Sequence, residues 1–263
     1  MMEPDNTETP ESEDQELSFL EHLVELRSRL LKACFVVLAV LIVLLPFSRK
    51  LYALLATPLT AVLPEGSSMI AIDVASPFLT PFKLSLLLAL IISIPVVLYQ
   101  LWAFVAPALY RQEKRLARPL LYSAVILFYA GCAFAYFVVF PLVFGFFTRV
   151  APDGVTVMTD ISKYLDFVTT LFLAFGITFE IPIATIILVA TGMTTVKKLS
   201  KMRGYVLVGA FALGMMLTPP DVISQTLLAL PMWLLFEIGL LLSRFLLPGR
   251  VTDANEPEDQ TTS

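Results

Sequence analysis

The side chains in this sequence that are best suited to chemistry are carboxylates. Glu180 and Glu237 lie inside long apolar runs, where an ionised carboxylate is costly unless it is paired, hydrated or protonated. Glu25 and Glu113 lie in polar segments beside basic residues, and a local salt bridge is the simplest explanation for each. Because they flank the same apolar runs, they would also suit a guanidinium ligand, which binds carboxylates bidentately.

The residues needed for enzyme chemistry are missing from the sequence. The only histidine, His22, lies outside every long apolar run, and the sequence has no Cys/His cluster for a metal. Gly209 and Gly214 have the spacing of a phosphate-binding loop, but Met215 and Met216 follow where Lys and Ser or Thr are needed. We therefore expect a protein that is not an enzyme, has no cofactor or metal, and takes its energy from a partner or a membrane gradient.

The elements that must position these carboxylates are membrane-spanning helices. The sequence is 57% hydrophobic with a mean hydropathy of +0.82, more apolar than a soluble core of this size can bury. A span needs about 20 apolar residues. We predict an all-α integral membrane protein with six spans, at about 30–47, 82–106, 119–147, 165–191, 204–218 and 222–243.

The fifth predicted span is short, because fifteen residues reach only about 22 Å against a hydrocarbon core of about 30 Å. Only residues 218–221 separate it from the sixth, so the two runs are either two spans or a re-entrant hairpin. We favour two spans, because the run from residue 222 onward is long enough to cross a bilayer.

The basic residues predict the orientation of the protein. Thirteen of the 18 Lys and Arg residues flank the spans on the side that holds both termini, which places the termini in the cytoplasm and requires an even number of spans. Residues 1–16 and 248–263 are acidic and are expected to be disordered tails on a membrane domain of residues 17–247.

Four prolines interrupt the predicted spans, and each is expected to kink its helix. Kinked helices rarely form a simple parallel bundle, so we expect a concave, glove-like shape. The four are Pro95, Pro141, Pro182 and Pro231.

Polar residues near the end of the fifth span form a second candidate contact. Met215, Thr218 and Gln225 either hydrogen-bond a partner helix or pack within this chain, and the sequence does not distinguish the two. Trp102 and Phe104, at the end of the second span, are more typical of membrane-interface anchors than of ligand contacts.

Six short segments of this sequence match the motifs of a known family. They are Leu20–Arg29, Ile72–Phe78, Tyr99–Pro107, Phe134–Phe137, Phe175–Glu180 and Leu217–Asp221. They resemble, in order, the TatC family, the polytopic subunit of the twin-arginine protein translocase. The resemblance covers about residues 17–247 and leaves the acidic N-terminal extension unexplained.

The resemblance implies a receptor in the bacterial inner (cytoplasmic) membrane that binds the twin-arginine signal peptides of folded cargo proteins. It also implies assembly with the single-span proteins TatA and TatB, a homo-oligomer within the receptor complex, and export driven by the proton-motive force; no nucleic-acid partner is expected. By position, the resemblance implies a signal-recognition region of Glu25, Arg27, Phe104 and Glu113, a partner site of Met215, Thr218 and Gln225, Glu180 on the concave face and Asp221 in the outer turn.

The residues alone leave two other functions open. A proton-coupled transporter of small solutes would use Glu180, and a passive scaffold for membrane proteins would tolerate alanine at Glu25, Glu113 and Glu180. The family resemblance favours the translocase receptor over both.

Overall fold

The computed structural model describes residues 10–60, 69–105, 114–150, 158–217 and 222–248. In these ranges the chain is helical, and the only extended pairing is an isolated bridge between Ile70 and Asp160. The elements are α1 (Pro10–Leu44), the 3-10 turn η1 (Leu45–Phe47), α2 (Ser48–Thr60), α3 (Ser76–Val105), α4 (Lys114–Phe134), the π-helical η3 (Ala135–Val139), α5 (Phe140–Val150), α6 (Ile161–Thr178), α7 (Ile181–Ala190), α8 (Val196–Lys201), α9 (Arg203–Leu217) and α10 (Val222–Leu246).

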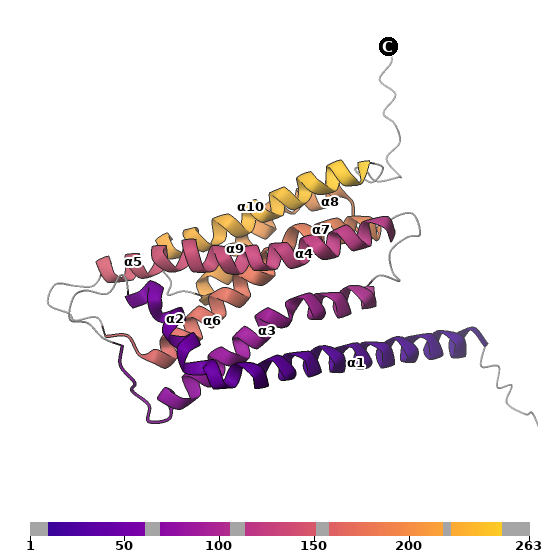
Figure 1. Cartoon of the computed structure of the whole chain (residues 1–263). Helices are drawn as coiled ribbons and strands as arrows, with labels where there is room; N and C mark the ends of the chain where they lie inside the picture. The colour runs from indigo at the N-terminus through magenta and orange to yellow at the C-terminus, as the bar shows by residue number, and fades with distance from the viewer. Residues whose placement is uncertain (1–9, 61–68, 106–113, 151–157, 218–221, 249–263) are drawn as a thin grey trace, which may run out of the picture.

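Successive helical runs alternate between two ends of the molecule (Figure 1). We call one end the basic end, where α1 begins, α8 lies and α10 ends; it carries Lys197, Lys198, Lys201, Arg203 and Arg244. We call the opposite end the cap end, where α2 lies beside the starts of α3 and α6 (Figure 1). The short helix α2 begins directly after the predicted first span, 30–47, and lies in the connection that follows the first helical run.

In the parts of the chain that the structure describes, five helical runs are long and apolar enough to cross a membrane, which confirms an all-α membrane protein. Four of them overlap the first four predicted spans, and the fifth, Gln225–Leu246, overlaps the last. The predicted span 204–218 corresponds to α9, a shorter apolar helix of 15 residues. Its length agrees with the sequence-based estimate of about 22 Å at about 1.5 Å per residue.

The first helix is longer than its predicted span. A single helix runs from Pro10 to Leu44, so α1 begins inside the stretch 1–16 predicted as a disordered tail. It packs mainly against α3 at the edge of the molecule, and most of its membrane-length stretch is exposed. In a bilayer, exposed apolar side chains such as Phe35 and Ile42 face lipid.

The core consists of two main clusters along the α6–α7 run, one built on α6 and the other on α7. The larger cluster joins α3, α4, η3, α5 and α6 through fully buried residues such as Leu84, Phe140 and Phe175. The second cluster joins the same run to α10 through Ile186 and Leu240. The α6–α7 run is therefore the central element of the fold.

The four prolines occupy different helical contexts. Pro95 and Pro231 lie inside the continuous helices α3 and α10, whereas Pro141 follows directly after the π-helical segment η3. Pro182 lies in the first turn of α7, after a two-residue turn that ends α6. A π-helical segment is one of the usual causes of a bend, so the structure adds a second local irregularity at Pro141.

Candidate functional site

A small hollow lies between α1 and α3 toward the basic end. It has a volume of about 150 Å³, and its lining is almost entirely apolar. The predicted site residue Phe104 lines it, as do Leu30 and Leu101, while Arg29 and Gln100 supply the polar groups. A narrow apolar hollow of this kind fits side chains of a peptide better than it fits a whole small-molecule ligand, which usually needs 300–1,000 Å³.

Glu25 does not line this hollow itself but pairs with Arg29, which does. Nε of Arg29 donates a hydrogen bond of 2.9 Å to Oε1 of Glu25, and Nη2 contacts the same oxygen. The sequence predicts a local salt bridge for Glu25, with Arg27 as the nearest basic residue. The structure instead pairs Glu25 with Arg29, four positions further along the helix. The i,i+4 spacing, which brings side chains together on one helix face, could have identified this pair.

Of the two remaining residues of the predicted signal-recognition region, the structure describes only Arg27. Arg27 is exposed and does not line the hollow, and Glu113 lies outside the described residues. Trp102, expected to be an interface anchor, is instead buried in the second core cluster at 7% exposure. Its burial fixes the end of α3 that carries Phe104.

Glu180 lies at the break between α6 and α7. The N–H of Phe179 donates to the carbonyl oxygen of Phe175, and the N–H of Glu180 donates to that of Ile177, which closes the last turn of α6. Pro182 follows in the first turn of α7, where its missing N–H costs nothing. The sequence therefore ends one helix and begins the next around Glu180, within the membrane-spanning run.

The side chain of Glu180 is half-buried, and its Oε1 has no hydrogen-bond partner within the described residues. The neighbouring backbone is tightly packed. A Cβ added at Gly131 of α4 would lie 2.5 Å from the carbonyl oxygen of Phe175, a distance that real Cβ atoms do not tolerate. The ring of Phe134 also packs against those of Phe175 and Phe179, at 5.5 and 5.6 Å between centroids.

Glu237, the other intramembrane carboxylate of the sequence analysis, is paired. Nη2 of Arg203 donates a 2.9 Å hydrogen bond to its Oε2, and Nε lies 2.7 Å from Oε1. The guanidinium thus faces both carboxylate oxygens and joins the start of α9 to α10. The sequence analysis did not identify Arg203 as the partner, because the two residues are 34 positions apart.

The predicted partner site divides into a packed part and an exposed part. The side-chain amide of Gln225 donates a 2.8 Å hydrogen bond to the carbonyl oxygen of Phe211, so it connects α10 to α9 within the chain. Met215 is 56% exposed. Thr218, together with Asp221 of the outer turn, lies outside the described residues.

One structural carboxylate at the cap end was missed by the sequence analysis. Oδ1 of Asp160 accepts hydrogen bonds from the N–H groups of Ser162 and Lys163 and so caps α6. Its Oδ2 accepts a bond from the N–H of Ile72, which ties the segment before α3 to the start of α6. These bonds, led by the one from Ile72, lower the pKa of Asp160 below its ordinary value.

Comparison with known proteins shows which family this chain is similar to. Residues 21–231 match the sequence profile of the family described as Sec-independent protein translocase protein (TatC). The TatC protein of Haemophilus influenzae is 56% identical over 248 residues, 94% of this chain and 97% of its own length. The TatC protein of Escherichia coli strain K12 is 58% identical over 226 residues, 86% and 88% of the two chains.

A solved structure has the same fold. The crystal structure described as twin arginine translocase receptor TatC superposes with a TM-score of 0.76 at 37% identity. The match covers 85% of this chain and 98% of that chain. The helical architecture and the match over most of the sequence together show that this chain belongs to the TatC family, a membrane-embedded component of the Sec-independent protein translocase.

Proposed function

We propose that this translocase subunit binds twin-arginine signal peptides at its basic end. The observation that carries the proposal is the hollow between α1 and α3, because its apolar lining includes Phe104 and its lining residue Arg29 is paired with the carboxylate of Glu25. A signal peptide offers the complementary pair, a guanidinium for the carboxylate and an apolar stretch for the hollow.

Glu25 is already paired with Arg29, and this pairing shapes the proposed mechanism. A peptide arginine would share or replace the guanidinium of Arg29, an exchange between like groups that leaves no buried carboxylate unpaired. We propose that Glu113 receives the second arginine and that Arg27 and Phe104 border the bound peptide. A lysine peptide would bind more weakly, because an ammonium lacks the planar fork of donors.

The experiment is photo-crosslinking in membranes from a probe introduced at Phe104 to a peptide with paired arginines. Tyr205 at the start of α9 supplies a matched control, because it is 78% exposed at the same end but does not line the hollow. We expect crosslinking from position 104, none from position 205, and a loss at 104 when paired lysines replace the arginines. Equal crosslinking of both peptides would contradict arginine recognition.

We also propose that the basic end faces the cytoplasm, that the chain crosses the membrane six times and that both termini are cytoplasmic. The alternation of helical runs between the two ends supports an even number of crossings (Figure 1), and the distribution of basic residues supports the orientation. Cysteine labelling from outside intact cells tests this: Val74, which is 97% exposed at the cap end, is expected to react when changed to Cys, and Met202 beside α8 is not.

We propose, finally, that TatA and TatB dock near the α9–α10 pair, that copies of the chain associate in the receptor complex and that the proton-motive force drives export. The exposed side chain of Met215 supports the docking site. Disulfide crosslinking from Met215→Cys to a single-span partner tests the first point. Export that persists after an uncoupler collapses the gradient would contradict the last.

A further inference from the structure

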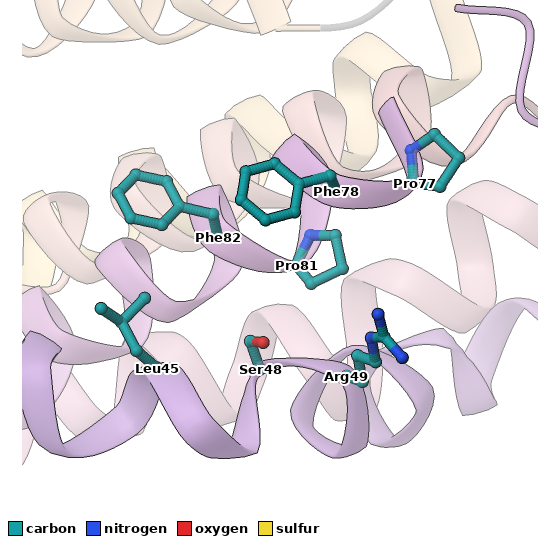
Figure 2. Close-up of a pocket in the computed structure, with 7 residues that line it drawn as sticks. All are labelled: Leu45, Ser48, Arg49, Pro77, Phe78, Pro81 and Phe82. Atoms are coloured by element: carbon teal, nitrogen blue, oxygen red, sulfur yellow. The ribbon is translucent and has the colours of Figure 1, made fainter. Parts of the chain in front are cut away.

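A pocket of about 500 Å³ lies at the cap end, outside the proposed signal-peptide site. Figure 2 shows its two walls: Pro77, Phe78, Pro81 and Phe82 from the first turns of α3 face Leu45 of η1 and Ser48 and Arg49 at the start of α2. The volume is within the range that holds a small ligand or a lipid headgroup.

The lining of this pocket is mostly apolar and carries a single charged group. Five of the seven lining residues are apolar, and the prolines among them have no N–H to donate. Arg49 is the one charged group in the lining, and it makes no ion pair with the described parts of the chain. A cation above an apolar wall fits an amphipathic anion, whose charge contacts the guanidinium while its tail covers the rings.

The position of Arg49 in the membrane identifies the kind of anion. No charged residue occurs between Lys32 and Arg49, and this helical stretch spans about 26 Å at about 1.5 Å per residue, close to the thickness of a hydrocarbon core. With Lys32 at one membrane surface, Arg49 lies at the headgroup level of the other. Phosphates of lipids are concentrated at that depth.

The pocket is continuous with surface that faces lipid. Phe78 is 76% exposed, and Ile42, less than two turns before Ser48, is 68% exposed. An acyl chain could therefore run from the pocket along apolar side chains without leaving the bilayer. An apolar helix of a partner protein would instead cover Arg49 without neutralising it, which is costly in a dry contact.

We propose that this pocket binds an anionic phospholipid, with the phosphodiester against Arg49 and one acyl chain against Phe78 and Phe82. A phosphodiester accepts charge-assisted hydrogen bonds from a guanidinium. The two walls belong to α3 and to η1 with the start of α2, so a bound lipid would also hold these elements together.

The test is native mass spectrometry of the full-length protein in detergent, titrated with phosphatidylglycerol. We expect Arg49→Gln to weaken binding of the first lipid about tenfold or more, from the loss of a charge-assisted hydrogen bond, and Arg49→Lys to weaken it less. Phe78→Ala should weaken binding several-fold through the lost apolar contact. Lys163→Gln is the matched control, because it removes an exposed cation at the same end outside the pocket and should leave binding unchanged.

Four results would overturn the proposal. Equal losses for Arg49→Gln and Lys163→Gln would show general attraction to a basic surface. Equal binding of phosphatidylcholine would show that the charge of the headgroup is not recognised, and full competition by inorganic phosphate would show a phosphate site without lipid selectivity. Efficient disulfide formation between two copies carrying Phe78→Cys, insensitive to added phosphatidylglycerol, would assign the pocket to a second copy of the chain. Size-exclusion profiles identify any variant that fails to fold, and for such a variant Arg49→Lys and Phe78→Ala still decide the outcome.

Discussion

The α6–α7 run and the α9–α10 pair each carry a glutamate, but they hold it in opposite ways. Half of the membrane-length stretch of α6–α7 is buried, and there Glu180 has a buried oxygen without a hydrogen-bond partner in the described chain. In α9 only Ala210 and Gly214 are buried. Oε1 of Glu237 in α10 also lacks a hydrogen bond in the described chain, but it lies 2.7 Å from Nε of Arg203, and Arg203 donates a hydrogen bond to Oε2. Close backbone packing holds the first region in place, whereas hydrogen bonds and an ion pair hold the second.

The contrast indicates different uses for the two carboxylates. An ion pair that joins two helices has an evident structural role. A buried carboxylate oxygen without such a pair, as at Glu180, is costly, and within the described residues it has no hydrogen-bond partner. We therefore propose that Glu237 is structural and that Glu180 acts in transport, and the experiments below probe the two regions.

The largest effect is expected from a methyl group at Gly131. Gly131→Ala would place a Cβ 2.5 Å from the backbone oxygen of Phe175, and separating α4 from α6 should cost about 3 kcal/mol. Gly209→Ala in α9 is the control, because its Cβ would meet nothing within 4 Å and should stabilise the helix by up to about 1 kcal/mol. Unfolding in detergent by a graded denaturant measures both; equal effects would show that α4–α6 packing is no tighter than that of α9.

A smaller effect is expected at the ion pair. A double-mutant cycle with Arg203→Gln and Glu237→Gln should give a coupling energy of about 1 kcal/mol, because the pair is partly exposed and so partly screened. Raising the salt concentration should reduce the coupling. A coupling near zero would show that the contact does not hold α9 against α10.

Glu180→Gln should change the free energy of unfolding by less than about 1 kcal/mol, because glutamine removes the cost of a buried carboxylate and keeps its shape. Protein export by the same variant should nevertheless fall if Glu180 acts in transport. Glu180→Asp is the comparison variant for the export measurement, because it keeps the carboxylate that Glu180→Gln removes. Normal export by the Gln variant would place Glu180 with the structural residues and remove the contrast with Glu237.

The smallest effect concerns Asp160, which anchors the start of α6. Its pKa is lowered in the folded protein, so its contribution to stability is present above the ordinary Asp pKa of about 3.9 and is lost as the pH falls through the lower folded value. The thermal midpoint of the protein should therefore fall with pH below about 4, and Asp160→Asn should make that fall shallower. An identical pH profile for the variant would show that the hydrogen bonds of Asp160 do not contribute.

The sequence determined that this protein lies in a lipid bilayer and where its main helices run, because both depend on local properties of the chain. Apolar runs of about 20 residues must form helices in a bilayer, where every backbone group needs an internal partner. For this reason the predicted spans fall on the observed helices, even at the short α9. The spacing of Glu25 and Arg29 is equally local, and the i,i+4 rule would have found that pair.

Only the tertiary structure decided which distant residues meet. The pairing of Arg203 with Glu237, the burial of Trp102 and the pocket between Arg49 and Phe78 each join separate helices. Such contacts depend on how far each helix is rotated and displaced against its neighbour, which close-packed side chains and glycines such as Gly131 determine together. Hydropathy along a chain records depth in the membrane, but it does not record which neighbour a helix face will meet.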